Sequence, residues 1–262
     1  MSADLSKRLV PDELWRLVAP LLPSFAARPQ DGGTAPRDQR AVFTAVVYVL
    51  TSGCAWRHLP PTFGTSSATA HRRFTVWTEV GLWRRLHRAV LDELGSGAKW
   101  TGPRRSSTRP PFAPKGGIAD RAEPGRSRQE GQQAACAVRC SGHPARRRRA
   151  LKPLILGIPA VRSRRGPRRC RPVKLRGDKA YFSAEHLIWL RERGIVACIA
   201  RPGTESGERL GRHRWKIERS IAWLFGYRRL TIRYERKGSH FLAFLSLAAA
   251  LTWYKKLAKL AT

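Results

Sequence analysis

The stretch Val173-Lys-Leu-Arg-Gly-Asp178-Lys-Ala-Tyr181 decides how the second half of the chain is interpreted. Val173 and Leu175 alternate with basic residues, which is typical of a short, half-buried strand. Gly177 ends that strand, so Asp178 stands at its carboxyl end, where a carboxylate can face solvent or a metal ion. On these residues alone, an aspartate in a solvated loop is the alternative interpretation.

A strand–helix–strand unit is predicted around this aspartate. Ser183 can cap a helix whose apolar residues recur at helical spacing, and Gly194 ends that helix. The apolar run 195–200 then predicts a second strand. Because α/β sheets bind ligands at the carboxyl ends of their strands, this unit gives Asp178 a favourable position for chemistry.

A second acidic residue follows in the segment Arg214-Trp-Lys-Ile217-Glu218. Ile217, Ile221 and Leu224 fall on one helical face, and Arg214 lies one turn before Glu218 on the same side. An apolar helix with one carboxylate among many cations is a poor design for surface salt bridges. It is better suited to aiming a glutamate at a metal ion bound beside a sheet.

Together these two motifs resemble those of the transposases of the IS5 insertion-sequence family, a branch of the larger IS4-like group. The segment Asp178-Lys-Ala-Tyr181 is similar to the second acidic motif of that family. The segment Arg214-Trp215-x-Ile217-Glu218-Arg219 is similar to its third acidic motif. The resemblance implies a ribonuclease-H-like DDE domain.

The resemblance also implies a metal-dependent reaction on phosphodiesters. In that family, three carboxylates hold two divalent ions, which activate the attacking oxygen and stabilise the leaving oxygen. Asp178 and Glu218 would be two of the catalytic residues and metal ligands. Oxygen ligands suit Mg²⁺ (or Mn²⁺) better than zinc.

The DNA contacts that the resemblance implies around these acids are all cationic: Lys179, Arg214, Arg219 and Arg228. Arg214 would neutralise a DNA phosphate or orient Glu218, and Lys179 and Arg219 would contact the backbone. The larger group often has a lysine or arginine about two turns after the glutamate. Here Phe225 occupies that place, and Arg228 or Arg229 would substitute for it.

The charge of the chain points to a polyanionic partner. Its 262 residues include 51 Lys and Arg against 18 Asp and Glu, which gives a net charge of +33 and a pI near 11.6. No apolar run approaches a membrane span and the N-terminus lacks a signal-peptide profile, so we expect a cytoplasmic protein without a membrane partner. Five cysteines in such a chain suggest reduced thiols.

The N-terminal residues predict a helical domain. Pro11 precedes a helix with an apolar stripe that ends at Pro23, and residues 37–52 predict a second helix that ends at Gly53. The segment Gly53-Cys-x-Trp56-Arg57-x-Leu59-Pro60 also resembles the N-terminal domain of IS5-type transposases. This region extends to about residue 95.

A basic helix pair follows inside this domain. Ser66 and Ser67 can cap a helix that runs through Trp77, and the next helix begins after Gly81, so the pair looks like a helix-turn-helix. Its candidate phosphate or base contacts are four arginines: Arg72, Arg73, Arg84 and Arg85. The alternative is a packing domain whose arginines only face water.

The chain changes character over residues 96–150. Leucine is absent between Leu94 and Leu151, and arginine, proline, glycine and glutamine dominate, so this segment predicts disorder. In the family, this is where the first catalytic aspartate and the first strands would stand. With suitable codons, Arg105 to Lys115 read two nucleotides later gives Phe-Val-Asp-Ser-Ala-Ser-Val-Arg-Ala-Lys, which looks like the first acidic motif. We therefore expect that small frame shifts replaced this part of the domain.

These inferences predict an α+β protein with three parts. They are a helical, helix-turn-helix-like DNA-binding domain at 1–95, a disordered basic segment at 96–150, and the remainder of an incomplete ribonuclease-H-like α/β domain at 151–262. The predicted function is that of an insertion-sequence transposase that binds element ends and target duplex DNA, with a homodimer on DNA as one arrangement. The missing third acid leaves two alternatives, a catalytically dead DNA-binding remnant and a general basic nucleic-acid-binding protein.

Overall fold

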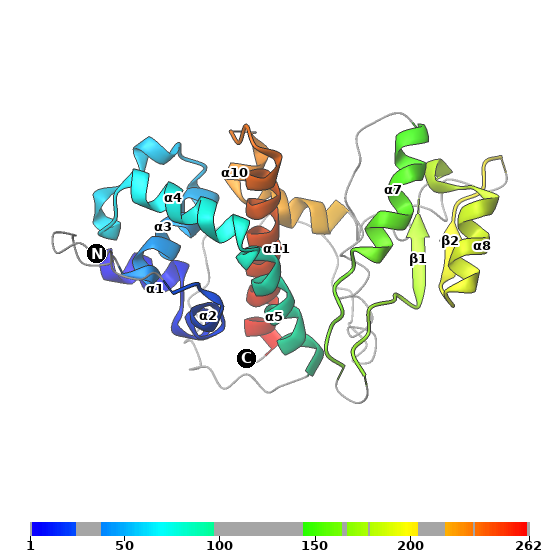
Figure 1. Ribbon diagram of the computed structural model, residues 1–262, viewed down its shortest axis with the longest axis horizontal. Helices are drawn as coiled ribbons and strands as arrows, with labels where there is room; N and C mark the ends of the chain where they lie inside the picture. The colour runs from blue at the N-terminus through cyan, green and yellow to red at the C-terminus, as the bar shows by residue number, and fades with distance from the viewer. Residues whose placement is uncertain are drawn as a thin grey trace, which may run out of the picture. The chain divides into compact units, whose positions relative to one another are not determined.

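The chain forms an α+β structure with a small parallel sheet. The computed structural model describes residues 2–24, 38–96, 144–163, 167–177, 179–203, 218–232 and 234–260 (Figure 1). It divides into two compact units, which are described separately. Unit 1 comprises Met1–Gly102, Val161–Pro167 and Ile221–Thr262, and unit 2 comprises Pro103–Ala160 and Arg168–Ser220.

Unit 1 is helical in the part that the structure describes. Its α-helices are α1 (Ser2–Leu9), α2 (Asp12–Val18), α3 (Gln39–Ser52), α4 (Ser67–Glu79), α5 (Leu82–Ser96), α10 (Arg228–Thr231) and α11 (Gly238–Leu260). Short 3-10 turns lie at Ala19–Leu21, Trp56–His58 and Pro61–Phe63. Residues 218–225 are helical as well, and the division between the two units falls inside that helix, after Ser220.

Helix α3 contacts α1, α4 and α10, and its ends follow from local chemistry. The Asp38 side chain accepts hydrogen bonds from the backbone N–H groups of Arg40 (3.0 Å) and Ala41 (3.3 Å), which satisfies donors at the first turn. Gly53 ends the helix in the left-handed conformation with φ of 73°. Between these ends, residues 42–47 are all buried, so α3 packs on every side.

Helices α4 and α5 follow each other with a two-residue connection. Ser66 caps α4 by accepting a hydrogen bond from the N–H of Thr69 (3.2 Å), as predicted from the sequence. Gly81 in the connection has φ of 70°, which glycine adopts without steric cost. Phe74 and Trp77 of α4 and Trp83 of α5 are buried, so both helices direct aromatic side chains into the core.

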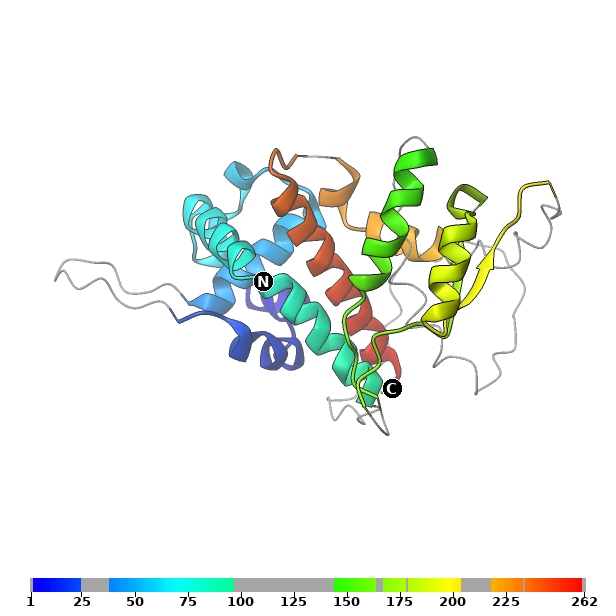
Figure 2. The same cartoon turned by 45° about the vertical axis from the view of Figure 1, so that its right-hand side comes forward.

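The C-terminal helix α11 packs into the same core as these N-terminal helices, beside α5 (Figures 1 and 2). Phe244 is fully buried and stacks on Phe74 with 4.4 Å between the ring centroids. The sequence predicts that this helix belongs to the domain at 151–262, whereas residues 221–262 fall in unit 1 by their contacts. The reason is that apolar side chains of α11 share one buried cluster with those of the N-terminal helices.

By length and composition alone, α11 would pass as a membrane-spanning helix, although the sequence predicts no apolar run long enough to span a membrane. Residues spread along its length are buried in the core of unit 1, among them Phe244, Leu247, Leu251 and Tyr254. The core helix of a soluble domain meets the same criteria of length and composition. The interpretation of this helix as a core element therefore agrees with its packing.

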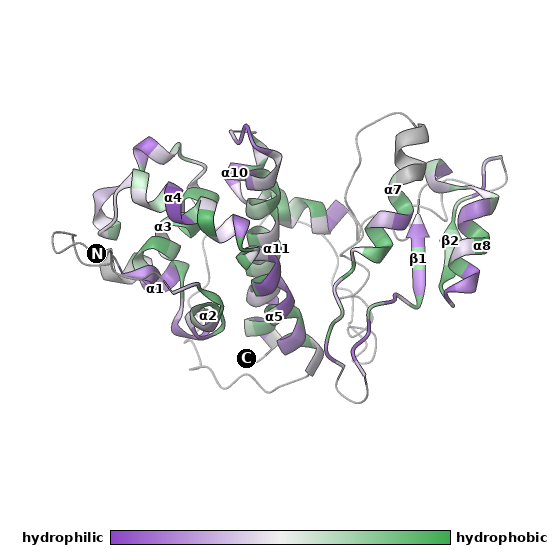
Figure 3. Cartoon of the chain, in the orientation of Figure 1, coloured by the Kyte–Doolittle hydropathy of each residue, from purple (hydrophilic) through white to green (hydrophobic). Residues whose placement is uncertain are grey.

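Unit 2 contains the strand–helix–strand segment that was predicted. Strand β1 (Lys174–Gly177) pairs in parallel with β2 (Val196–Ile199), and α8 (Ala184–Glu192) connects them. One face of this sheet contacts α7 (Pro144–Leu156) and α8 through a small apolar core: Leu151, Ile155, Leu175, Leu190, Ile195 and Ile199. Alternate residues are exposed, including Lys174 and Arg176, and β1 is accordingly drawn mainly in purple in Figure 3.

The segment predicted to be disordered, 96–150, is helical at both of its ends. Ser96 closes α5, and Pro144 begins α7, while residues 97–143 lie outside the described residues. Helix α7 is anchored by Leu151 and Ile155, which are 5% and 4% exposed. From that anchor the helix extends backwards through Ala145, Ala150 and four arginines, all good helix formers, to a proline at its first position.

We predict that replacing Phe244 by alanine destabilises unit 1 by about 3–5 kcal/mol, because a fully buried aromatic ring leaves a cavity. Urea unfolding followed by tryptophan fluorescence measures this change. The matched control is Leu242→Ala on the same helix, since Leu242 is 60% exposed and its loss should change stability by less than about 0.5 kcal/mol. Equal effects of the two substitutions would contradict the placement of α11 in this core.

Candidate catalytic acids and nucleic-acid interface

Hydrogen bonds fix the backbone before and after position 178, at the carboxyl end of β1. The carbonyl of Gly177 accepts a hydrogen bond from the N–H of Ala200 (3.3 Å), which continues the pairing with β2. A 3-10 turn at Lys179–Tyr181 follows, and the carbonyl of Tyr181 lies 2.9 Å from Nδ1 of the buried His186. Asp178 itself lies outside the described residues, so the structure fixes its neighbours on either side.

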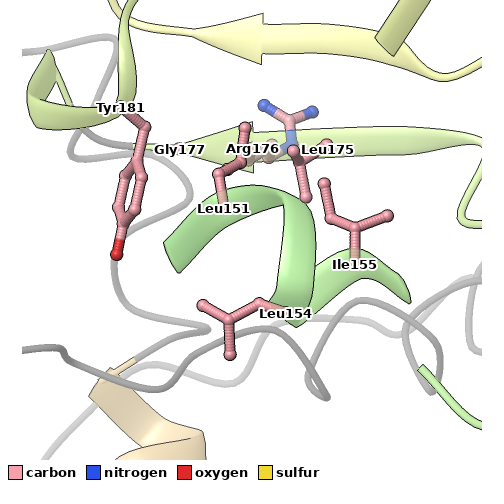
Figure 4. A pocket seen from close by; sticks show the side chains of 7 residues that line it. All are labelled: Leu151, Leu154, Ile155, Leu175, Arg176, Gly177 and Tyr181. Atoms are coloured by element: carbon pink, nitrogen blue, oxygen red, sulfur yellow. The ribbon is translucent and has the colours of Figure 1, made fainter. Parts of the chain in front are cut away.

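A shallow hollow lies beside this strand end and is mainly apolar. Figure 4 shows Leu151, Leu154 and Ile155 of α7 on one side of β1, with Tyr181 at the end where the strand finishes. A methyl group added to Gly177 would lie 3.4 Å from Ile199 and 3.7 Å from Tyr181, which is ordinary packing distance. This hollow supports the strand end by packing and offers no set of metal ligands.

Glu218 stands at the first described position of the helix at 218–225, and its side chain is exposed, as is that of Arg219. Arg214 lies outside the described residues. Among the residues that the structure describes, no group of three or more His, Cys, Asp or Glu side chains could hold a metal ion. The pairing of Glu218 with Asp178 is therefore a prediction from the sequence that the described residues leave untested.

Two neighbouring arginines after this helix have different environments. Arg229 is buried, and it donates through Nε to Oε1 of Glu235 (2.9 Å) and through Nη1 to the carbonyl of Cys54 (2.6 Å). Arg228 is exposed on the same short helix. Of these two candidates for a DNA contact after Glu218, only Arg228 has a side chain that can reach a ligand.

The buried carboxylate of Glu235 has a second neighbour. Nδ1 of His240 lies 3.8 Å from Oε2 of Glu235, and the His240 ring meets His71 of α4 edge-on at 5.7 Å. Burial lowers the pKa of His240, and Glu235 opposes that shift. The cluster of Arg229, Glu235 and His240 is a group of buried polar side chains in the core of unit 1, and no sequence pattern predicts it.

The four arginines predicted on the helix pair are not equivalent. Arg72 and Arg84 are exposed, whereas Arg73 is half-buried, and burial, followed by the neighbouring charge of Arg72, lowers the pKa of Arg73. Arg85 is exposed, and its Nη2 donates to the carbonyl of Leu21 (3.1 Å), which ties α5 to the end of the α2 segment. Burial separates Arg73 from Arg72 and Arg84, and the hydrogen bond to Leu21 separates Arg85 from them.

A half-buried histidine, His87, follows Arg84 and Arg85 on α5. Nε2 of His87 is buried without a hydrogen-bond partner among the described residues, and desolvation lowers the pKa of His87 to about 4. The sequence carried a signal for it, because His87 is four residues after the buried Trp83 and so shares its helical face. At neutral pH this side chain is therefore uncharged.

Two family models match the chain. One is described as "Putative transposase of IS4/5 family" and matches residues 10–87, and the other is described as "Transposase DDE domain" and matches residues 136–253. The chain belongs to the IS4/IS5 family of DDE transposases. The resemblance found in the acidic motifs is thus confirmed at the level of the family.

Curated relatives agree with this assignment. The chain is 44% identical over 107 residues to the "Putative transposase for insertion sequence element IS402" of Burkholderia cepacia, which covers 41% of this chain and 51% of that protein. It is 39% identical over 92 residues to the "Insertion element IS402 uncharacterized 16.2 kDa protein" of the same organism. This match covers 34% of the present chain and 63% of that protein. The chain thus spans about half to under two thirds of the length of these relatives. No solved structure matches the chain.

The matched ranges of the IS4/IS5 family divide the candidate residues into two sets. The first range contains Arg72, Arg73, Arg84 and Arg85. The DDE range contains the other candidates, which are Asp178, Lys179, Arg214, Glu218, Arg219 and Arg228. Residues 88–135 fall between the two ranges. The DDE range also includes most of α11, which packs in unit 1.

We predict that His87 makes unit 1 sensitive to acid. The pKa of His87 is near 4 in the folded chain and about 6.5 when unfolded, so its stabilising effect is complete above pH 6.5. As pH falls from 6.5 to 4 the unfolded chain binds the proton first, and up to about 3 kcal/mol of stability is lost.

Replacing His87 by leucine should remove this part of the pH dependence, as measured by urea unfolding at pH 7 and pH 4. His58→Leu is the control, because His58 is exposed. If the His87→Leu chain and the unmodified chain lose the same stability between these pH values, His87 does not carry the effect.

Proposed function

We propose that this chain is a transposase of an insertion sequence, which binds the ends of its element and acts on duplex DNA. The observation that supports this most directly is the parallel β1–α8–β2 unit, in which the Asp178 motif directly follows the end of β1. The family assignment and the net charge of +33 support a DNA substrate. We further propose that the protein acts in the cytoplasm and binds DNA as a homodimer.

A DDE domain implies a divalent metal ion in general, and we propose Mg²⁺ (or Mn²⁺) with Asp178 and Glu218 as ligands. Both donors are carboxylates, which suit a hard cation. Glu218 is exposed on its helix. When bound, such ions activate the attacking oxygen and stabilise the leaving oxygen of a phosphodiester. Lys179, Arg214 and Arg219 would hold the DNA backbone next to these acids.

We propose that α4 and α5 form the DNA-reading pair, as a helix-turn-helix-like arrangement. The two-residue connection at Val80 and Gly81 supports this, and so do the exposed side chains of Arg72 and Arg84. Arg85 and Arg73 would contribute charge close to the backbone of the DNA, while part of their function is structural. Arg228 would add a contact after the Glu218 helix.

The remaining fold assignment is also a proposal. We propose that β1, α8 and β2 belong to an incomplete ribonuclease-H-like sheet, whose first strands and first acid were lost to frame shifts between Lys99 and Ala150. The parallel pair is covered on one face within the described residues, whereas parallel sheets are normally covered on both. The unmatched range 88–135 overlaps the segment in question. We therefore propose domain boundaries at about residues 95 and 150. Helix α11, although it lies after residue 150, packs in the core of unit 1.

A second candidate function follows from the missing third acid. With two carboxylates in place of three, one metal ion would be poorly fixed, so this copy would bind DNA without cutting it. The third alternative, a general basic nucleic-acid-binding protein, would show no preference for the ends of an insertion element. Sequencing the gene and its flanks for terminal inverted repeats separates these two alternatives.

The whole chain should bind duplex DNA with an affinity that falls steeply as salt increases, because each phosphate contact releases counterions. We use the whole chain because the core of unit 1 includes α11. Arg72→Gln and Arg84→Gln should each lower the slope of log affinity against log salt by about one.

Fluorescence anisotropy with labelled duplex at several salt concentrations measures these slopes. The control is Arg16→Gln, because Arg16 is an exposed cation on α2, where it lies 3.8 Å from Glu13. An affinity that does not change with salt, or an equal effect of all three substitutions, would contradict the interface on α4 and α5.

We expect strand cleavage with Mg²⁺ at or near background for the chain as it stands, because the third acid is absent. A version in which the reading frame restores Phe-Val-Asp-Ser and the following strands should cleave DNA, and Asp178→Ala or Glu218→Ala should abolish that activity. Gel analysis of end-labelled duplex measures the products. Robust cleavage by the unmodified chain that Asp178→Ala removes would mean that another acid, with Asp120 and Glu123 as first candidates, supplies the third ligand.

A further inference from the structure

Two segments that lie far apart in the sequence meet around Arg229. The first is the loop Gly53–Trp56, which follows α3, and the second is the stretch Arg228–Glu235. Arg229 has a side chain that is only 3% exposed, and it joins the carboxylate of Glu235 in the second segment to the carbonyl of Cys54 in the first. We call this set of contacts the clamp.

Aromatic rings surround the guanidinium group of Arg229. Its central carbon lies 4.7 Å from the ring centroid of Tyr234, 5.6 Å from Phe244 and 5.9 Å from Trp56. A planar cation can stack on rings and donate in its own plane at the same time, which lysine cannot do. The site therefore selects arginine for its shape as well as its charge.

The backbones of the two segments also approach each other closely at Gly53. This glycine has φ of 73°, and a methyl group added to it would lie 2.7 Å from Cβ of Arg228 and 3.1 Å from its carbonyl carbon. Any other residue at position 53 would be strained and would push α10 away. The glycine that ends α3 thus also permits the contact between the two segments.

The clamp lies directly after the helix that carries Glu218. That helix ends with a hydrogen bond from the N–H of Gly226 to the carbonyl of Ala222 (3.0 Å), and the N–H of Tyr227 donates to the carbonyl of Leu224 (3.1 Å). Tyr227 and Leu230 are 5% and 6% exposed in the core of unit 1. Hydrogen-bonded backbone therefore runs without a gap from the helix to the clamp.

We propose that Arg229 is a positioning residue, which fastens the C-terminal end of the Glu218 helix to unit 1. The proposal rests on the role assigned to Glu218 under the proposed function. Because Arg229 follows the last residue of the 218–225 helix by four positions, fixing it also fixes the C-terminal end of the helix on which Glu218 stands. The N-terminal Gly-Cys-x-Trp segment thereby acts on the catalytic acid through Arg229, and does not itself need to touch DNA.

Amide hydrogen exchange of the whole chain, read by mass spectrometry, tests this without DNA or metal. Arg229→Met should raise the exchange rate over residues 218–231 about tenfold or more, because the buried Glu235 loses its partner and the end of the helix is released. Arg229→Lys keeps the charge and should restore slow exchange in part. Arg228→Met is the matched control, because Arg228 is the neighbouring arginine and its side chain is exposed. This substitution should change the exchange rate by less than about twofold. Exchange in α8 of unit 2 should be the same in all variants.

Three results would overturn the proposal. In the first, exchange over 218–225 is unchanged in Arg229→Met while exchange in α3 rises. In the second, Arg228→Met raises the exchange rate over 218–231 as much as Arg229→Met does. In the third, the Arg229→Lys chain exchanges as fast as Arg229→Met. If Arg229→Met does not fold, Gly53→Ala takes its place, and slow exchange over 218–225 in that variant also overturns the proposal. A wild-type chain that binds no DNA would defeat the proposed function and leave this exchange result standing.

Discussion

The packing of α11 against α4 and α5 is the interaction on which the N-terminal half of the molecule depends. Phe244 stacks on Phe74 at 4.4 Å and lies 6.0 Å from Trp56, so residues more than 160 positions apart share one aromatic core. Such contacts between distant segments bury the apolar face of α5, which the N-terminal helices cannot cover alone. The chain therefore leaves unit 1, forms unit 2 and returns to complete the core of unit 1.

A buried ion pair inside this core has a cost as well as a benefit. Removing one partner of such a pair typically destabilises a protein by about 3–5 kcal/mol, whereas replacing both with apolar residues is often neutral. Stability alone therefore does not explain why Arg229 and Glu235 are there. The additional hydrogen bond from Arg229 to the carbonyl of Cys54 fixes how the two segments lie relative to each other. Hydrogen bonds of a buried ion pair are directional and can specify such a placement, whereas apolar contacts are not directional.

The basic side chains differ in burial, and this separates arginines with a structural role from arginines that are exposed to a ligand. Arg229 is enclosed and Arg85 is partly engaged by the carbonyl of Leu21, whereas Arg72, Arg84 and Arg228 are exposed. Counting basic residues would give all five the same role. Their different burial restricts the proposed DNA contacts to a smaller set, which makes the salt dependence of individual substitutions informative.

The sequence by itself determined the local elements, because these depend on neighbouring residues. The caps at Ser66 and Ser183, the stop at Gly53 and the alternation in β1 predicted the helix ends and the parallel strand–helix–strand unit. The acidic motifs identified the family for the same reason. Only the tertiary structure decided that α11 belongs with the N-terminal helices, that Arg229 is enclosed while Arg228 is exposed, and that His87 is uncharged. Each of these depends on which distant surfaces meet, and the periodicity of a single segment shows that a face is buried without showing what buries it.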